Sequence, residues 1–343
     1  MALNFLSMLS TEIGLDLGTA NTLIYVKGKG IVVNEPSIVA LEEETDKVIA
    51  IGNEAREMIG RTHQGIITIR PLKDGVIADF EATEIMMREL IKKANVNRML
   101  LSKIVIDVPS GITEVEKRAV RDSAERAGAR EVHLVAEAMA AAIGVGLDIS
   151  NPVGNMIVDI GGGTSEIAVI SLNGIVHHSS IRVGGDELNQ AIIQFFKKNF
   201  NLLIGEKTAE LIKCTIGSAV PLPEEITTEV KGRDLVDGIP KTIEISSVEI
   251  REALNEAIET IIDAIKVALE RTPPELASDI LDRGIILTGG GALLRSIDAR
   301  MRESTSLPIH VADDPLTCVV RGCGKILDNF EQFEKVLLRP RRI

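Results

Sequence analysis

The pattern of apolar and polar positions contains one unusual motif twice. In residues 13–26 an apolar run ends in Asp16, a short turn follows, and apolar positions resume; residues 156–170 repeat this order around Asp159. Runs of this kind predict pairs of β-strands joined by a turn. Because the whole unit recurs, we expect two similar halves that face each other, each with one carboxylate and one loop.

The turns of both motifs contain more glycine than a simple reversal of the chain needs. Glycine loses more conformational entropy on folding than other residues, so the three at 161–163 indicate that bare backbone N–H groups approach something bulky and anionic. A polyphosphate fits, with Asp16 and Asp159 placed to hold a divalent metal directly or through water. The alternative is a tight structural hairpin with a capping aspartate.

Elsewhere strands alternate with amphipathic helices, which is typical of an α/β protein. Glu137 stands where a strand passes directly into a helix. It is therefore either a helix-start carboxylate favoured by the helix dipole or a residue that positions water near the second loop. A third glycine turn, 288–291, precedes a predicted helix over 292–301. The other predicted helices are 81–94, 113–127, 138–146, 187–200, 206–216, 247–271 and 315–327.

Two apolar stretches do not fit a buried element directly. In residues 1–10 polar positions recur every three to four residues, which predicts a helix with a wide apolar face. That helix lies in a membrane interface, docks on the protein's own core, or is a disordered start. The triplet 99–101 is expected in a surface loop unless it begins the next strand. The candidate membrane-contacting residues are Leu3, Phe5, Leu6, Met8, Leu9, Met99, Leu100 and Leu101.

Composition narrows the class of protein. With 343 residues, 45% apolar and 26% charged, the chain is an ordinary globular protein long enough for two domains. A net charge of −12 repels nucleic acid, and with no Trp and one Tyr there are few aromatic side chains for base stacking. Three cysteines without metal-ligand spacing indicate reduced thiols in a cytoplasmic chain. No apolar run approaches the ~20 residues that span a bilayer.

Several motifs go beyond the repeat itself. DLGTANT at 16–22, NEPS at 34–37, RPLKDGVIADF at 70–80, VDIGGGT at 158–164, GDELN at 185–189 and ILTGGGALLR at 286–295 resemble the actin, heat-shock-70 and sugar-kinase superfamily, and within it the bacterial actins. The resemblance spans residues 13 to about 327. It implies an α/β, actin-like ATPase fold, with two duplicated ribonuclease-H-like domains around a nucleotide cleft and a smaller subdomain on each.

The resemblance also implies roles for individual residues. Glu137 corresponds to a glutamate that aligns the attacking water, and with Asp159 and Asp16 it forms the implied catalytic set. The spacing of Glu210 and Lys213 would by itself indicate only an intrahelical ion pair, but the resemblance places both near the ribose and base. The implied nucleotide-binding residues are Gly18, Thr19, Ala20, Asn21, Gly161, Gly162, Gly163, Thr164, Gly185, Asp186, Glu210, Lys213, Gly289, Gly290 and Gly291.

The implied activity is that of a Mg²⁺-dependent ATPase that forms filaments, with GTP as the alternative nucleotide. Such a protein is cytoplasmic, lies at the inner face of the cell membrane, organises wall synthesis and maintains rod shape. Its implied partners are further copies of itself in paired protofilaments, inner-membrane lipid and membrane proteins of the wall-elongation machinery, but not nucleic acid. The alternative is a small-molecule kinase of the same superfamily, for which the chain shows no dedicated acceptor residues.

Two further expectations come from the resemblance. The chain reads Ala136, Glu137, Ala138, Met139 where the family usually has Glu-Glu-Pro-Met, so this turn is expected to be looser and the hydrolysis rate altered. The expected subdomains are IA (1–39, 73–151 and 322–343), IB (40–72), IIA (152–188 and 252–321) and IIB (189–251).

Overall fold

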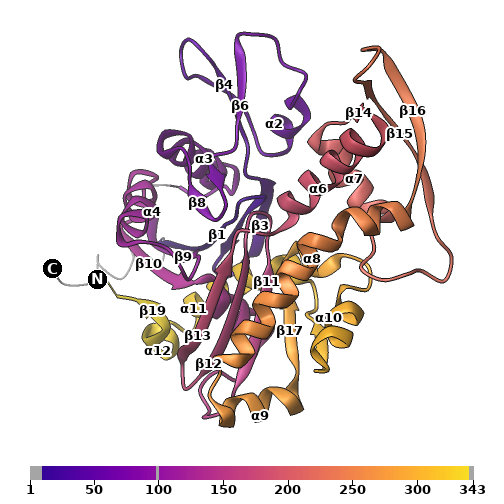
Figure 1. Cartoon of the computed structure of the whole chain (residues 1–343). Helices are drawn as coiled ribbons and strands as arrows, with labels where there is room; N and C mark the ends of the chain where they lie inside the picture. Colours follow the sequence, from indigo (N-terminus) through magenta and orange to yellow (C-terminus); the bar gives the residue numbers. More distant parts are fainter. Residues whose placement is uncertain (1–9, 98–99, 340–343) are drawn as a thin grey trace.

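The computed structural model describes residues 10–97 and 100–339. The candidate membrane residues of segment 1–9, and Met99, therefore lie outside the described residues. Two large sheets stand side by side with helices around them, and a smaller sheet projects beyond each (Figure 1). None of the helices in the described part of the chain combines the length and apolarity needed to cross a bilayer.

The two large sheets share the same arrangement of five strands, to which the first sheet adds β19. Their strand orders are β19-β10-β9-β1-β2-β3 and β13-β12-β11-β17-β18. In each, the strand that carries the motif aspartate, β1 or β11, pairs antiparallel with the next strand and parallel with a later one. This shared arrangement confirms the duplicated α/β fold. The strands are β1 (Thr11–Leu17), β2 (Asn21–Val26), β3 (Gly30–Pro36), β9 (Leu101–Val108), β10 (Glu131–Ala136), β19 (Leu337–Leu338), β11 (Asn155–Ile160), β12 (Ser165–Ser171), β13 (Gly174–Ile181), β17 (Ile285–Thr288) and β18 (Ile309–Val311).

Helices cover the sheets, and local sequence sets several of their ends. Thr113 and Glu116 form a capping box at the start of α4, and Ser246 and Glu249 form another at α8. Helix α5 ends at Gly146, whose φ of 94° favours glycine. The helices are α2 (Asn53–Met58), α3 (Phe80–Lys93), α4 (Glu114–Arg126), α5 (Glu137–Val145), α6 (Gly185–Phe200), α7 (Glu206–Ile216), α8 (Ser247–Glu270), α9 (Pro274–Arg283), α10 (Ile297–Thr305), α11 (Cys318–Asp328) and α12 (Phe330–Phe333).

Each half carries a small three-stranded sheet. One has the order β5-β4-β6 and the other β14-β15-β16. Both project on the same side of the molecule in Figure 1, above the loops that end β1 and β11. The subdomain boundaries remain a prediction. The remaining strands are β4 (Val39–Glu42), β5 (Val48–Ile51), β6 (Ile66–Ile69), β7 (Leu72–Lys73), β8 (Val76–Ile77), β14 (Leu202–Leu203), β15 (Thr227–Asp234) and β16 (Pro240–Ser246).

Helices α5 and α11 join the two halves at backbone contact. A Cβ on Gly144 would collide with the carbonyl of Cys318, and one on Gly322 with the carbonyl of Ala140. Both helices share one apolar cluster with residues of the first large sheet and of the second. Because protein interiors are closely packed, the contact between α5 and α11 fixes the relative position of the two halves at this point.

The structure corrects two local expectations. Leu101 is fully buried at the start of β9 and Leu100 is half-buried, so the surface-loop interpretation is wrong for Leu101, which begins the next strand. The third glycine turn leads into a short 3₁₀ turn, Gly290–Leu293, rather than an α-helix over 292–301. The α-helix begins only at Ile297, because Ser296 has a left-handed φ of 58°.

Candidate functional site

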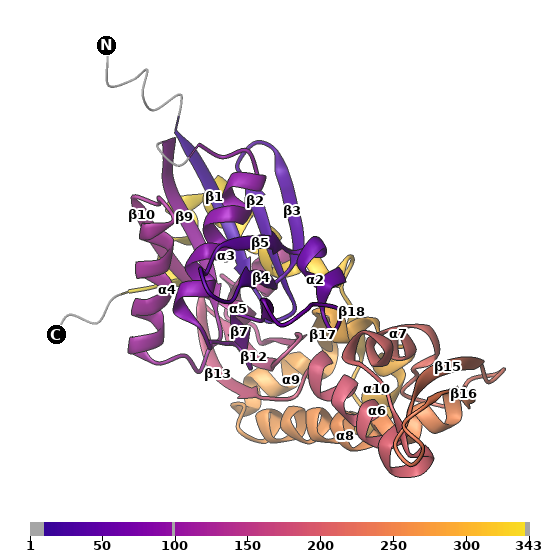
Figure 2. The ribbon, with the colours of Figure 1, turned by 90° about the horizontal axis from the view of Figure 1, so that it is seen from above.

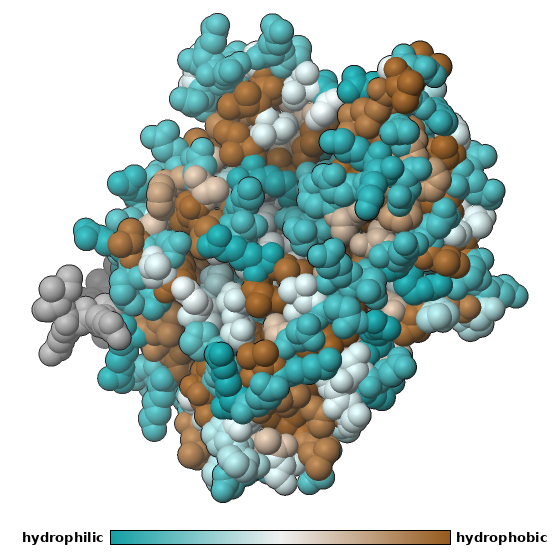
Figure 3. Space-filling model, in the orientation of Figure 1, coloured by the Kyte–Doolittle hydropathy of each residue, from teal (hydrophilic) through white to brown (hydrophobic). Residues whose placement is uncertain are grey.

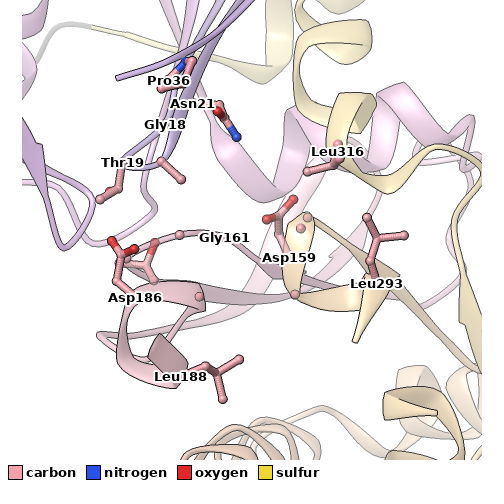
Figure 4. Close-up of a pocket in the computed structure, with 18 of the residues that line it drawn as sticks. Gly18, Thr19, Asn21, Pro36, Asp159, Gly161, Asp186, Leu188, Leu293 and Leu316 are labelled. Carbon is pink, nitrogen blue, oxygen red and sulfur yellow. The ribbon is translucent and has the colours of Figure 1, made fainter. Parts of the chain in front are cut away.

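One large cavity lies where the loops of the two halves meet. Its volume is about 530 Å³, which is within the usual range for small-molecule sites. Both predicted loops line it, together with the third glycine turn. Figure 4 shows Asp159 pointing into the space between the second motif and the first-loop residues Gly18 and Asn21. The two motifs therefore face each other across a single site.

The first loop is held by side chains from neighbouring segments. The N–H of Leu17 donates to Asp107 Oδ1 over 3.2 Å, and Ser37 Oγ donates to the carbonyl oxygen of Gly18 over 2.6 Å. These contacts fix the first loop before any ligand is bound. Ligand binding would therefore cost little conformational entropy in this loop.

The second loop closes on the start of α6. The N–H groups of Gly185 and Asp186 donate to the carbonyl oxygens of Gly161 and Gly162, over 2.9 and 2.8 Å. A Cβ on Gly184 would lie 2.6 Å from the Gly162 oxygen and 2.7 Å from the Gly161 oxygen, so only glycine fits there. Helix α6 thereby sets the path of the loop.

Three carboxylates, those of Asp16, Glu137 and Asp159, line the cavity, and the buried carboxylate of Asp107 lies close to them. Strands β10, β9 and β1 run parallel and adjacent, so Glu137, Asp107 and Asp16 come together near their carboxyl ends; Asp159 joins from β11. Burial, followed by the neighbouring acids, raises the pKa of Asp16 and of Glu137 well above the ordinary value. Burial also raises the pKa of Asp107 to about 7 and that of Asp159 to about 6. A bound cation would relieve this repulsion.

Glu137 is the first residue of α5 and lies beside the second loop. A Cβ on Gly161 would be 4.0 Å from Glu137 Oε1 and 4.0 Å from Asp159 Oδ1, so the two carboxylates flank the same glycine. Ala136, which precedes the helix, provides no side-chain cap. This position suits a residue that orients water against a phosphate on the second loop.

The site fits a divalent cation only in combination with oxygens of a ligand. Within residues 10–97 and 100–339, no group of three or more His, Cys, Asp or Glu side chains is arranged to coordinate a metal ion. Mg²⁺ usually keeps several waters and binds through one or two carboxylates plus substrate phosphates. Asp16 and Asp159, whose ionised forms are disfavoured in the protein alone, are the residues that fit such a coordination shell.

Helix α7 places Glu210 and Lys213 at the cavity. Lys213 Nζ donates to the carbonyl oxygen of Gly185 over 2.8 Å, and burial lowers the pKa of Lys213. Glu210 Oε2 instead accepts from Arg56 Nη2 over 2.6 Å, from α2 on the opposite side of the cavity. The interpretation of Glu210 and Lys213 as a simple intrahelical pair is therefore wrong.

The third glycine turn closes the cavity beside β17. A Cβ on Gly289 would lie 2.6 Å from Asp159 Oδ1, and one on Gly291 would overlap a side chain of β11. Leu293 and Leu316, 56% and 40% exposed, form an apolar wall on this side of the cavity (Figure 4). An apolar wall beside polar loops suits the face of a base.

Several residues of the site were not predicted from the sequence. Thr288 Oγ1 donates to Asp159 Oδ2 over 2.8 Å and orients this carboxylate. Asp107 has a local signal, since a carboxylate interrupts the apolar run 104–108. Arg56 lines the cavity without any such signal, and Arg70 begins the motif at 70–80, to which no role was assigned; the folding of the small sheet brings both there.

Known proteins resemble this chain along nearly its whole length. A family model described as MreB/Mbl protein matches residues 10–335. The chain is 54% identical over 334 residues to the cell shape-determining protein MreB of Escherichia coli strain K12, with 96% of each covered. MreB5 of Spiroplasma citri bound to ADP superposes with a TM-score of 0.90 at 42% identity, covering 94% of this chain and 98% of that one. Its AMPPNP-bound form matches with the same TM-score, covering 97% of that chain. The MamK double helical filament has the same fold, with a TM-score of 0.78 at 21% identity, covering 93% of this chain and 99% of that one.

Proposed function

The chain belongs to the MreB/Mbl protein family, and on this premise we propose that it is a filament-forming cytoskeletal protein that hydrolyses ATP and determines cell shape. Membership confirms the resemblance to bacterial actins drawn from the sequence motifs. A relative with 54% identity is a cell shape-determining protein, and another with the same fold was solved with ADP and AMPPNP. The small-molecule kinase alternative is not favoured by these relatives.

The observation that carries the proposal is the cavity between two equivalent loops. One loop comes from each half, each begins with a buried aspartate, and Glu137 lies beside the second. A triphosphate needs N–H donors on both sides and a positive counter-charge. The two loops would provide the donors, and the two aspartates would hold the cation that provides the charge.

In the proposed reaction the chain contributes position and electrostatics. The N–H groups of both loops would hold phosphate oxygens, and Asp16 with Asp159 would hold Mg²⁺ directly or through water. When bound, the metal would neutralise charge that develops on the phosphates. Glu137 would orient the attacking water in line with the leaving oxygen.

Each small three-stranded sheet and the helix beside it, α2 or α7, form what we call a small lobe. Self-assembly is proposed to use exposed apolar surface on these small lobes. In the turn of the β15–β16 hairpin, Val236 and Ile239 are 76% and 59% exposed. Figure 3 shows apolar colour at the tip of this lobe. Apolar patches of this kind suit a contact with another subunit.

Membrane attachment is proposed to come from the N-terminal segment. The apolar residues of 1–9 would lie in the interface of the inner membrane, and a filament would present many copies at once. Leu101 is excluded from this contact by its burial. Membrane proteins of wall elongation are the further partners we propose from the family.

Sedimentation and light scattering test the function directly. On addition of ATP and Mg²⁺ the purified chain should form sedimentable polymer and release phosphate without any acceptor molecule. GTP in place of ATP reports the base preference. ADP formation only in the presence of an added small-molecule acceptor, with the phosphoryl group on that acceptor and no polymer, would support the kinase alternative instead.

A further inference from the structure

Three ion pairs join the two halves at and beside the cavity, and we call them the latch. They join Arg56 Nη2 to Glu210 Oε2 at 2.6 Å, Arg70 Nη2 to Glu206 Oε1 at 2.6 Å, and Lys207 Nζ to both carboxylate oxygens of Glu57 at 2.9 Å. The residues on one side belong to α2 or follow β6, and all those on the other side belong to α7. Helices α2 and α7 lie near each other in both Figure 1 and Figure 2.

The latch shares a helix face with the proposed nucleotide contacts. Glu206, Glu210 and Lys213 follow one another at intervals of four and three residues, so they lie on one side of α7. Lys213 on this face contacts Gly185 at the start of α6. Any movement that opens the latch therefore also moves the residues proposed to meet the ribose and base.

Helix α2 is tied firmly to its own half. The N–H of Asn53 donates to Glu35 Oε2 over 2.8 Å, and Glu35 also pairs with Lys93 of α3. Because α2 is anchored in this way, parting the latch requires the two small lobes to separate rather than α2 to swing alone.

We propose that the latch gates the nucleotide site. A bound nucleoside diphosphate or triphosphate leaves when the three ion pairs part, and Arg56 holds the carboxylate of Glu210 in the orientation that receives the ribose. The inference rests on the proposed nucleotide function and adds to it the element that sets the rate of exchange.

The strength of the latch follows from its exposure. Its side chains are 31–64% exposed, so each pair is partly screened by water and salt. Pairs of this kind shift an equilibrium by about two- to fivefold each. Three of them acting together would slow release appreciably while leaving it sensitive to ionic strength.

The Lys207–Glu57 pair gives the cleanest test, because neither residue lines the cavity. Release of a fluorescent ADP analogue would be followed by stopped flow at protein concentrations below polymerisation. Lys207→Ala and Glu57→Ala should each release it about two- to fivefold faster than the native chain. The exchanged pair, Lys207→Glu with Glu57→Lys, should return the rate towards the native value. At high salt the differences should disappear.

Lys266→Ala is the matched control, since its partner Asp263 lies within the same helix, α8. It should leave the release rate unchanged. Single variants with the native rate, or an exchanged pair as fast as the singles, would overturn the latch while leaving the nucleotide site intact. A native chain that does not bind the analogue would overturn the nucleotide function and the gate together.

Discussion

Gly162 of the second loop lies directly against Ala20 of the first. A Cβ on Gly162 would stand 2.6 Å from the Ala20 Cβ and 3.0 Å from its N atom, closer than such atoms approach in proteins. The two loops are thus in contact across the boundary between the halves. The distance between the proposed phosphate-binding surfaces therefore depends on how closely the halves pack.

Gly162→Ala should push the two loops apart and weaken nucleotide binding by about tenfold or more, since a misplacement of this size disturbs both sets of N–H donors. Titration with a fluorescent ADP analogue measures the effect. Ala20→Gly in the same chain should recover part of the affinity, because it removes the atom that collides. Gly174→Ala is the control, as its Cβ would approach nothing closer than 3.6 Å. Equal affinities for Gly162→Ala and the native chain would contradict the proposed two-loop clamp.

Glu137→Gln and Glu137→Ala should keep nucleotide binding and lose most turnover. Binding should persist because Glu137 lies beside the second loop without belonging to it. Turnover should fall because a positioned general acid or base typically raises the reaction rate by about 10²- to 10⁴-fold. Phosphate release at saturating ATP, compared with the dissociation constant for ADP, separates the two effects. Unchanged phosphate release would exclude Glu137 as the residue that orients water.

Asp107→Asn should stabilise the nucleotide-free protein at neutral and alkaline pH. The pKa of Asp107 is raised from 3.8 to about 7 by burial, so the folded state binds more protons than the unfolded state between these values. The free energy of unfolding of the native chain therefore falls as pH rises through this window, by up to about 4 kcal/mol from this group. Asn keeps an acceptor for the Leu17 N–H.

Urea denaturation of both proteins at pH 5, 6, 7 and 8 measures the effect. The stability gain of Asp107→Asn should be largest at pH 8 and shrink towards pH 4, where the carboxyl is protonated in the folded state and begins to be protonated in the unfolded state as well. A variant less stable than the native chain at pH 8 would show that the Asp107 carboxylate is satisfied in the fold.

Removal of residues 1–9 should abolish co-sedimentation with liposomes of anionic lipid while leaving ATP-dependent polymer intact. The apolar side chains in this segment each contribute up to ~1.5–3 kcal/mol when fully buried, and less in an interface. Phe5→Glu with Leu6→Glu is the matched substitution in the full-length chain. Undiminished binding after the deletion would place the membrane contact elsewhere on the molecule.

Local signals were sufficient for most elements and for both loops. Helix α7 has the predicted bounds, α4 begins at the predicted capping box of Thr113 and Glu116, and the two aspartate-glycine motifs face one cavity. These features depend on periodicity, capping and turn chemistry, which act between residues close in the chain. Local signals predicted two places less well. An apolar residue such as Leu101 can lie in a surface loop or in a buried strand, and a glycine turn can lead into 3₁₀ geometry, as it does before Ile297, instead of directly into an α-helix.

Tertiary packing alone decided which distant side chains share the site. Asp107 meets the first loop because β9 pairs with β1, and Arg56 meets Glu210 because the small lobes approach each other across the cavity. The raised pKa values of the four carboxylates likewise come from burial and mutual repulsion in the folded protein. Such contacts join residues that are far apart in the chain, so no local pattern encodes them; the motifs specify the two loops, and only the packing of the two halves makes them one site.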